Sequence, residues 1–150
     1  MNTIQIEQIL ENDKYSKKYF KSVLSIDQLP VLKSKIKNSA FVINTDKRTG
    51  KGEHWISVFY DKNSDCQFFD SLGFGPEFYG LDQFFMKTGN NLTTNKFAVQ
   101  SVLSEYCGHY SVLFILIRSR KIAFQKFLEY FNEDVLKNDL KLKNFLQQFI

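Results

Sequence analysis

The sequence predicts an α+β fold in which helices pack around a small sheet. Three observations support this prediction: helical periodicity at both ends, short alternating segments in the middle, and a nearly uncharged apolar run at 110–117. The chain has 150 residues, of which 43% are hydrophobic and 24% are charged. These values are typical of a globular protein, and we expect residues 1–150 to form a single domain.

The first part of the chain predicts two helices. Residues 3–11 (TIQIEQILE) place Ile4 and Leu10 on one apolar side, as a short amphipathic helix does. Further on, the tetrapeptide Asp-Gln-Leu-Pro is a turn signal that ends at Pro30. Because proline is favoured at the first position of a helix, we expect a second helix over 31–37, ending near the asparagine that follows.

Three strands are predicted next, and the last two form a hairpin. Residues 40–45 (AFVINT) carry β-branched side chains, and a polar loop over 46–53 (DKRTGKGE) follows them. Residues 54–61 (HWISVFYD) have alternating faces, and residues 66–70 (CQFFD) pair back onto them across a polar turn. One face of the first hairpin strand carries His54, Ile56, Val58 and Tyr60, and the other carries Trp55, Ser57 and Phe59.

The second half of the chain is predicted to be mostly helical. Residues 77–87 predict a helix and residues 96–101 (KFAVQS) a strand. From Gly108 to the end we expect helix, with breaks near Lys121 and Asn132. The last ten residues are amphipathic, because four apolar residues fall at helical spacing. They are Leu142, Phe145, Leu146 and Phe149.

Composition and charge argue against several classes of protein. No apolar run reaches the roughly 20 residues that cross a bilayer, and the N-terminus lacks the pattern of a secretory signal. Two cysteines are too few for a disulfide scaffold, which favours a reducing compartment, and the cysteine and histidine spacing predicts no zinc site. The net charge of +4 fits a solvated lysine-rich surface, with weak nucleic-acid attraction as the alternative. The sequence contains no phosphate-binding loop and no nucleic-acid-binding motif.

The segment SEYCGHYSVLFILI (104–117) places one of the two cysteines where a buried helix is expected to begin. A free thiol has a pKa of about 8.5, and both a helix N-terminus and a protonated histidine lower it. Gly108 removes side-chain bulk where a substrate approaches the backbone. Cys107 is therefore the candidate nucleophile, and Gly108 is a candidate substrate-binding residue.

Three further residues are predicted to complete a site around Cys107. His54 starts one strand of the hairpin and Asp70 ends the other, so antiparallel pairing brings the two together. The carboxylate then orients the imidazole and stabilises its charged form. The amide of Gln100 and the backbone N–H of Cys107 form a candidate oxyanion hole.

Each of these residues also has a structural interpretation when it is taken alone. A lone buried cysteine is usually a core residue, and an aspartate before Ser-Leu-Gly often only forms a turn. Cys66 lies within a predicted strand, and we interpret it as structural. Side chains two apart on a helix do not face each other, so we expect His109 to pack near the helix start rather than act as the base.

Two stretches resemble the adenovirus maturation protease (adenain) family: FVINTDKRTGKGEHWISVFYDKNSDCQFFDSLGFGPE and QSVLSEYCGHYSVLF. The shared motifs are His-Trp, then an acidic residue, then Gln followed seven residues later by Cys-Gly. The resemblance covers about residues 20–120. The same set is similar to that of the SUMO-deconjugating Ulp proteases, and in its short length the chain most resembles maturation proteases of virophages and Polinton transposons.

The resemblance implies an α+β relative of the papain fold, with the catalytic order permuted to His, Asp, Cys. It implies a small mixed sheet packed by helices and a nucleophile at the start of a buried central helix. In this fold Cys107 would be the nucleophile, His54 the general base and acid, and Asp70 the group that orients His54. Adenain has Glu at this last position, whereas Ulp-type enzymes have Asp. Gln100 would be the oxyanion donor, and Trp55 would pack against the site and bind substrate.

The resemblance also sets expectations for partners and location. The family's substrates are capsid and core precursors cut after small residues, often glycine, so we expect a monomeric protease of such precursors in the virion and the infected cell, without a membrane partner. Adenain is activated by a peptide that is disulfide-linked to a second cysteine, but residues 73–106 contain no cysteine. The sequence itself requires no cofactor, and the resemblance leaves room for a noncovalent activating peptide or for DNA.

Two rival functions stay open at the level of sequence. The first is removal of ubiquitin or SUMO by the same chemistry, although Ulp catalytic domains usually carry more chain. The second is a non-catalytic, basic nucleic-acid-binding module that kept the fold. Ordinary reactivity of the Cys107 thiol, together with salt-sensitive DNA binding, would favour the second.

Overall fold

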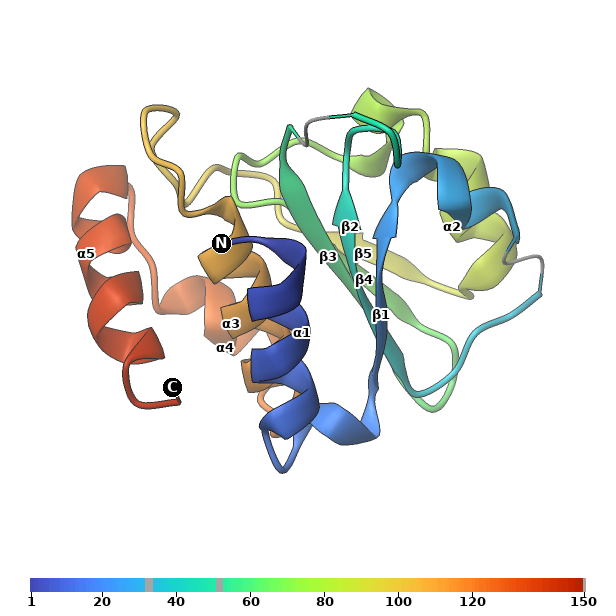
Figure 1. Cartoon of the computed structure of the whole chain (residues 1–150), viewed down its shortest axis with the longest axis horizontal. Helices are drawn as coiled ribbons and strands as arrows, with labels where there is room; N and C mark the ends of the chain where they lie inside the picture. Colours follow the sequence, from blue (N-terminus) through green and yellow to red (C-terminus); the bar gives the residue numbers. More distant parts are fainter. Residues whose placement is uncertain (32–33, 51–52, 150) are drawn as a thin grey trace.

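A five-stranded mixed sheet forms the centre of the computed structural model, which describes residues 1–31, 34–50 and 53–149 (Figure 1). The strands are β1 (Phe20–Ser25), β2 (Ser39–Asn44), β3 (Trp55–Tyr60), β4 (Cys66–Phe69) and β5 (Leu92–Thr94). Their order in the sheet is their order in the chain. β2, β3 and β4 form an antiparallel meander, whereas β1 and β5 pair in parallel at the two edges. The predicted α+β class is confirmed.

Helices cover both faces of this sheet (Figure 1). The α-helices are α1 (Thr3–Asn12), α2 (Asp82–Thr88), α3 (Cys107–Ser119), α4 (Phe124–Glu129) and α5 (Val135–Leu146). Short 3₁₀ helices are η1 (Ser16–Lys18), η2 (Ile26–Val31) and η3 (Pro76–Tyr79). One hydrophobic core joins α1, α3, α4 and α5 to one face of the sheet. A second core joins η2 and α2 to the other face.

The alternation predicted for β3 is confirmed by these two cores. Phe59 lies in the core shared with α3, and Trp55 packs against it. Ile56, Val58 and Tyr60 lie in the core shared with α2. Because both faces are buried, a shift of β3 by one residue would exchange its two sets of side chains between unlike cores, so the register is strongly specified.

α3 is held in the core along most of its length. Every residue from Tyr110 to Ile117 is buried. The ring of Phe114 stacks on Phe69 of β4, with centroids 5.2 Å apart, and meets Phe124 and Phe127 of α4 at 5.1 and 5.6 Å. Burying one such side chain contributes about 1.5–3 kcal/mol. This packing fixes the position of the N-terminal end of α3, where Cys107 lies.

The helix predictions for the first part of the chain are partly wrong. Residues 3–11 do form α1, but Ile4 is 64% exposed, while Ile6 and Leu10 are buried. The helix predicted over 31–37 is wrong: Val31 ends the 3₁₀ helix η2, and residues 34–37 form neither helix nor strand. Residues 32 and 33 lie outside the described residues. Pro30 lies within η2 instead. The start of η2 is stabilised because the backbone N–H and the hydroxyl of Ser25 both donate to the side chain of Gln28.

The strand predicted over 96–101 is also wrong. The N–H groups of Val99 and Gln100 both donate to the carbonyl of Ser71, at 2.9 and 3.0 Å, so a loop rather than a neighbouring strand satisfies this backbone. Edge strands β1 and β5 take part in the sheet instead. The helix predicted over 77–87 divides into η3 and α2, because Gly80 takes a left-handed conformation with φ 71°.

The C-terminal predictions are largely confirmed. The expected break near Lys121 falls between α3 and α4, where this residue has φ 63°. The expected break near Asn132 falls between α4 and α5. Leu142 and Leu146 are buried and Phe145 and Phe149 are partly buried, as the helical spacing predicts.

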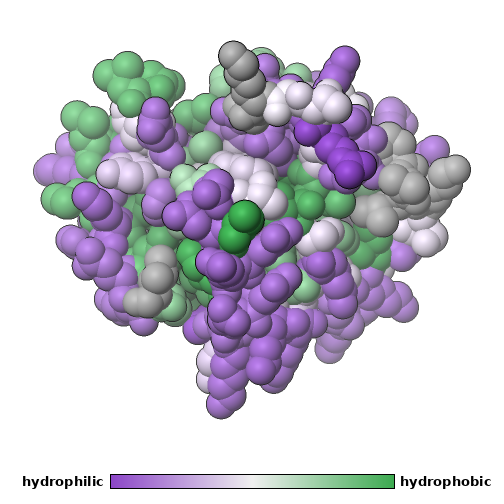
Figure 2. All heavy atoms as spheres, viewed as in Figure 1, coloured by the Kyte–Doolittle hydropathy of each residue, from purple (hydrophilic) through white to green (hydrophobic). Residues whose placement is uncertain are grey.

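The surface is mainly polar, with local hydrophobic exposure. Figure 2 shows hydrophilic atoms over much of this face and hydrophobic atoms at its upper left, over the loop between β5 and α3 in Figure 1. In that loop Val102 and Leu103 are 83% and 89% exposed. Among the described residues, no helix is both long and apolar enough to span a bilayer.

Candidate active site

The β3–β4 hairpin brings His54 and Asp70 together, as the sequence predicts. His54 immediately precedes β3 and Asp70 immediately follows β4. The Nε2–H of His54 donates to Oδ1 of Asp70 at 2.6 Å. The Asp70 carboxylate is fully buried, and the His54 side chain is 12% exposed. Because a carboxylate only accepts hydrogen bonds, Nε2 carries the proton, which leaves Nδ1 for another partner.

Several groups hold Asp70 in place besides His54. The N–H of Leu72 donates to Oδ1 at 2.9 Å, and the hydroxyl of Tyr79 donates to Oδ2 at 2.5 Å. The side chain of Asn95 donates to the Asp70 carbonyl at 2.6 Å and accepts from its N–H at 3.1 Å. Both oxygens of this buried carboxylate therefore have hydrogen-bond donors, which offsets the cost of burying its charge.

Cys107 is the first residue of α3, and its sulfur contacts His54. The preceding residue, Tyr106, makes no capping hydrogen bond from its side chain. Burial alone would raise the pKa of the Cys107 thiol. A hydrogen bond and charge from His54, with backbone N–H groups of Trp55 and Gly108, outweigh burial and lower that pKa below its usual value.

His54 changes in the opposite direction. Burial alone would lower the pKa of its imidazole, but the hydrogen bonds and charges of Asp70 and Cys107 raise it to about 9. A lowered thiol pKa beside a raised imidazole pKa favours a thiolate–imidazolium pair at neutral pH. With a carboxylate on the far side of the ring, this arrangement supports nucleophilic catalysis.

Gln100 is buried close to the start of α3 in sequence, and its side chain is held on both sides. The Ser71 hydroxyl donates to Oε1 of Gln100 at 2.5 Å, and Nε2 of Gln100 donates to the Ser104 carbonyl at 2.9 Å. A side-chain amide carries two N–H donors, and the bond to the Ser104 carbonyl uses one of them. Gln100 is 3% exposed, and its part in an oxyanion hole stays a prediction.

Trp55 and Gly108 lie against each other beside Cys107. The indole N–H of Trp55 donates to the Met1 carbonyl at 3.1 Å. A Cβ built at Gly108 would stand 3.0 Å from Cδ1 of Trp55 and 3.1 Å from Cβ of Met1. Gly108 is buried, so its lack of a side chain admits the indole and the N-terminal segment; the substrate-binding roles of Trp55 and Gly108 stay predictions.

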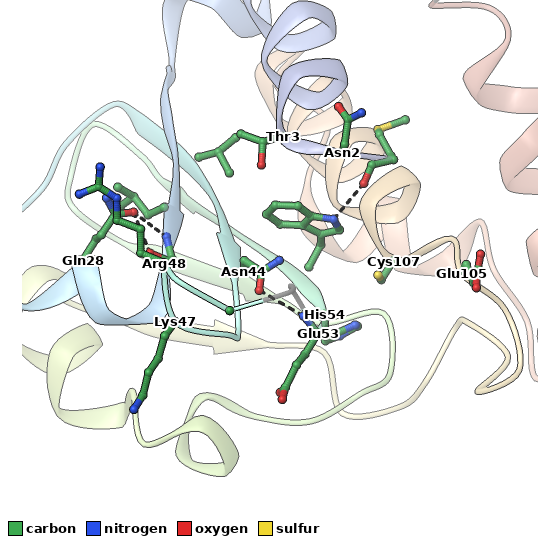
Figure 3. Close-up of a pocket in the computed structure, with 16 residues that line it drawn as sticks. Asn2, Thr3, Gln28, Asn44, Lys47, Arg48, Glu53, His54, Glu105 and Cys107 are labelled. Atoms are coloured by element: carbon green, nitrogen blue, oxygen red, sulfur yellow. Dashed lines mark hydrogen bonds between the residues drawn. The ribbon is translucent and has the colours of Figure 1, made fainter.

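A cleft of about 530 Å³ opens beside Cys107 (Figure 3). Trp55 is among its lining residues. Figure 3 shows Cys107, His54 and Glu105 toward one end of the cleft, with Gln28 and Arg48 at the other. A volume in the range of about 300–1,000 Å³ is typical of ligand sites.

The other cysteine and the other histidine behave as the sequence predicts. Cys66 is fully buried in β4. His109 packs edge-on against the ring of Tyr106, with centroids 5.1 Å apart. Burial lowers the pKa of His109, helped by the charges of the N-terminal amine and Lys143. No group of three or more His, Cys, Asp or Glu side chains suited to a metal ion occurs within the described ranges.

The sequence does not point to three residues that support the site: Met1, Tyr79 and Asn95. The sequence predicts one helix over residues 77–87, and its helical periodicity does not indicate that the Tyr79 hydroxyl contacts Asp70. A glycine directly after Tyr79 is the one available signal, because it permits the left-handed turn that ends η3.

The family model described as adenovirus endoprotease matches residues 25–133, from the end of β1 to the loop after α4. The chain belongs to the adenovirus endoprotease family. This match includes every residue of the predicted catalytic site, and the resemblance seen in the sequence is confirmed. The chain is thus a member of a family of cysteine proteases.

The curated relatives are viral. Two proteins of African swine fever virus, named SUMO-1 cysteine protease S273R (Pretoriuskop isolate) and Cysteine protease S273R (Badajoz strain), are each 29% identical to the chain over 100 residues. The alignment covers 58% of this chain and 36% of each relative. The chain therefore spans only about a third of the length of these African swine fever virus relatives.

Two solved structures are similar to the chain. A crystal structure of the African swine fever virus pS273R protease has 27% sequence identity and a TM-score of 0.39, covering 69% of this chain and 43% of that one. The central domain of an uncharacterised Legionella pneumophila protein has 12% identity and a TM-score of 0.47, covering 100% of this chain and 98% of that one.

Proposed function

We propose that the protein is a cysteine endopeptidase in which Cys107 is the nucleophile and His54 the general base and acid. Asp70 orients His54 and stabilises its charged form. The observation that carries the proposal is one continuous series of contacts, from the Cys107 sulfur to the His54 ring and from Nε2 of that ring to Asp70. Nδ1 of His54 is the ring nitrogen left to face the sulfur.

The first half of the reaction forms an acyl-enzyme. The Cys107 thiolate attacks the scissile carbonyl carbon, which makes a C–S bond and moves the carbonyl electrons onto oxygen. When the intermediate collapses, the C–N bond breaks and the His54 imidazolium gives its proton to the leaving amine. The new N-terminus leaves, and His54 becomes neutral.

The second half releases the acid. Neutral His54 takes a proton from water as the water oxygen attacks the thioester carbon. Collapse of this second intermediate breaks the C–S bond and restores the Cys107 thiolate beside the His54 imidazolium. Both intermediates carry an oxyanion, for which the backbone N–H of Cys107 and the amide of Gln100 are the proposed donors.

The proposed substrates are capsid or core precursors of a virus or a virus-like element. Support comes from the family, whose model describes a viral endoprotease, and from the viral origin of the curated relatives. The proposal places the protein in the virion and the infected cell, as a monomer. DNA or a noncovalent peptide are proposed activators, and the net charge of +4 is compatible with DNA.

The test is cleavage of the precursor proteins encoded beside this chain. We expect the wild-type protein to cut them next to glycine and Cys107→Ala to lose the cutting. Cys66→Ala is the matched control: it removes the same atom from a buried thiol in β4, away from His54, so we expect cleavage to persist. Cutting by Cys107→Ala would refute the assignment of the nucleophile.

A second candidate function is removal of SUMO or another ubiquitin-like protein. The name of one set of relatives, SUMO-1 cysteine protease, favours it. The chemistry at Cys107 would be the same, and only the substrate would differ. Measuring kcat/KM for SUMO and ubiquitin conjugates beside glycine-containing capsid segments separates the two. A larger value for the conjugates would replace the capsid assignment.

A further inference from the structure

The carboxylate of Asp70 has one oxygen that does not face His54, and Tyr79 supplies its donor. Oδ1 accepts from His54 and from the N–H of Leu72, whereas the hydroxyl of Tyr79 donates to Oδ2 at 2.5 Å. Asp70 is fully buried, so solvent does not reach Oδ2 to replace a lost donor. The rotation of this carboxylate therefore depends on the hydroxyl of Tyr79.

The short segment around Tyr79 holds that hydroxyl in position. Tyr79 ends η3, directly before Gly80, which has φ 71° and whose N–H bonds back to Glu77. The Tyr79 ring lies 6.5 Å from Phe68 of β4 and 5.1 Å from Phe78, centroid to centroid. Burial raises the pKa of the Tyr79 phenol, and the charge of Asp70 raises it further, so the oxygen keeps its proton and remains a donor.

We propose that Tyr79 is a positioning residue of the active site, which fixes the Asp70 carboxylate so that Oδ1 stays directed at His54. This inference rests on the proposed function of Cys107, His54 and Asp70. Tyr79 acts through Asp70, to which its hydroxyl donates. Without the Tyr79 hydroxyl, Oδ2 of Asp70 lacks its donor, and the carboxylate is free to rotate away from His54. The imidazolium of His54 is then less well stabilised.

The test is Tyr79→Phe, which removes a single oxygen atom. Loss of a hydrogen bond to a charged group is expected to lower kcat about tenfold, with KM nearly unchanged. Because the His54 imidazolium loses support, the alkaline limb of the kcat/KM profile should move to lower pH than in the wild type. A residue that only stabilised the fold would leave this limb where it is.

Tyr60→Phe is the matched control. The Tyr60 hydroxyl is also buried, but its partners are the neutral Oγ1 of Thr88, at 2.7 Å, and the thiol of Cys66, on the face of the sheet away from α3. We expect Tyr60→Phe to lower the unfolding temperature without moving the alkaline limb. Unfolding curves for both variants show that each is folded under the assay conditions.

A double substitution shows whether Tyr79 acts through Asp70. In the Asp70→Asn background, adding Tyr79→Phe should cost little further activity, because the carboxylate that Tyr79 positions is already gone. Full additivity, or an unchanged pH profile in Tyr79→Phe, would overturn the inference. Either result would leave the proposed function intact as long as Cys107→Ala is inactive, so the two failures are distinguishable.

Discussion

Gly108 leaves space for the Trp55 indole beside Cys107, the proposed nucleophile, and this space defines the first prediction at the scale of residues. In Gly108→Ala the new Cβ would stand 3.0 Å from the indole, close enough to displace it. The gain in helix propensity, about 1 kcal/mol, offsets much of the strain. We therefore expect little change in unfolding free energy but a several-fold higher KM for peptide substrates. Unchanged steady-state kinetics would show that the indole position does not matter to substrate.

Gln100 gives a second prediction at this scale. Gln100→Ala removes the proposed oxyanion donor, and we expect kcat to fall by about 10²–10³. Ser71→Ala is the control, because it removes only the hydroxyl that donates to Oε1 of Gln100 and leaves the amide present. Its effect should be smaller. Equal losses in both variants would mean that Gln100 acts only through its place in the buried loop.

The sequence predicts the members of the site better than their supports. His54 and Asp70 meet because they end two strands of one hairpin, and strand pairing is a local pattern that the sequence reveals. Tyr79 reaches Asp70 from the end of the short helix η3, and Asn95 reaches it from the loop after β5, where tertiary contacts rather than periodicity set the backbone. Such contacts leave no regular spacing in a sequence.

At the scale of elements, α3 is the rigid support of the site. Phe114 lies at the centre of α3 and packs against β4 and α4. Removing its ring would leave a cavity between α3, β4 and α4. We expect Phe114→Ala to lower the unfolding free energy by about 3–5 kcal/mol. Phe97→Ala should cost much less, because Phe97 is 48% exposed. Urea unfolding of both variants measures the difference, and similar midpoints would contradict the packing described for α3.

The element predictions succeed where periodicity is strong and fail at short or edge segments. β2, β3 and β4 contain apolar runs long enough for the sequence alone to predict strands. β5 has three residues with exposed or half-buried side chains, and β1 carries mixed side chains at the edge of the sheet, so neither has a clear alternating pattern. Residues 96–101 look like a strand because Val99 is apolar and buried, but their backbone bonds to the loop at Ser71.

At the scale of the whole molecule, Arg120 joins three separate parts of the chain. It follows α3, and its guanidinium donates to both oxygens of Asp13, after α1, at 2.6 and 3.2 Å. The same group lies over the rings of Tyr15 and Phe149, 4.7 Å from each centroid. The ends of α1, α3 and the C-terminal segment therefore meet at one cation.

We expect Arg120→Gln to lower the unfolding free energy at pH 7 by about 1–2 kcal/mol. Burial alone would raise the pKa of Asp13, but the bonds from Arg120 and Ser16 lower it below 3.8. The ion pair is therefore fully present above pH 3.8 and lost as the pH falls through the lowered value.

Chemical denaturation from pH 7 into the acid range should show the wild type and Arg120→Gln converging as Asp13 gains its proton. The exposed pair of Lys137 and Asp134, 3.9 Å apart, offers a control, and Lys137→Gln should leave the unfolding free energy nearly unchanged. A difference between wild type and Arg120→Gln that stayed constant with pH would assign the whole effect to stacking on the rings.

The most direct test of the proposed chemistry is the alkylation rate of the Cys107 thiol as a function of pH. This rate shows whether the negative charge on Cys107 depends on an ion pair with His54. With iodoacetamide, and with the modified residue located by mass spectrometry, we expect Cys107 to react well below the pH of an ordinary thiol, about 8.5. In His54→Ala the rate profile should return to that ordinary range. A wild-type profile already centred near it, and unmoved by His54→Ala, would contradict the thiolate–imidazolium pair on which the proposed chemistry depends.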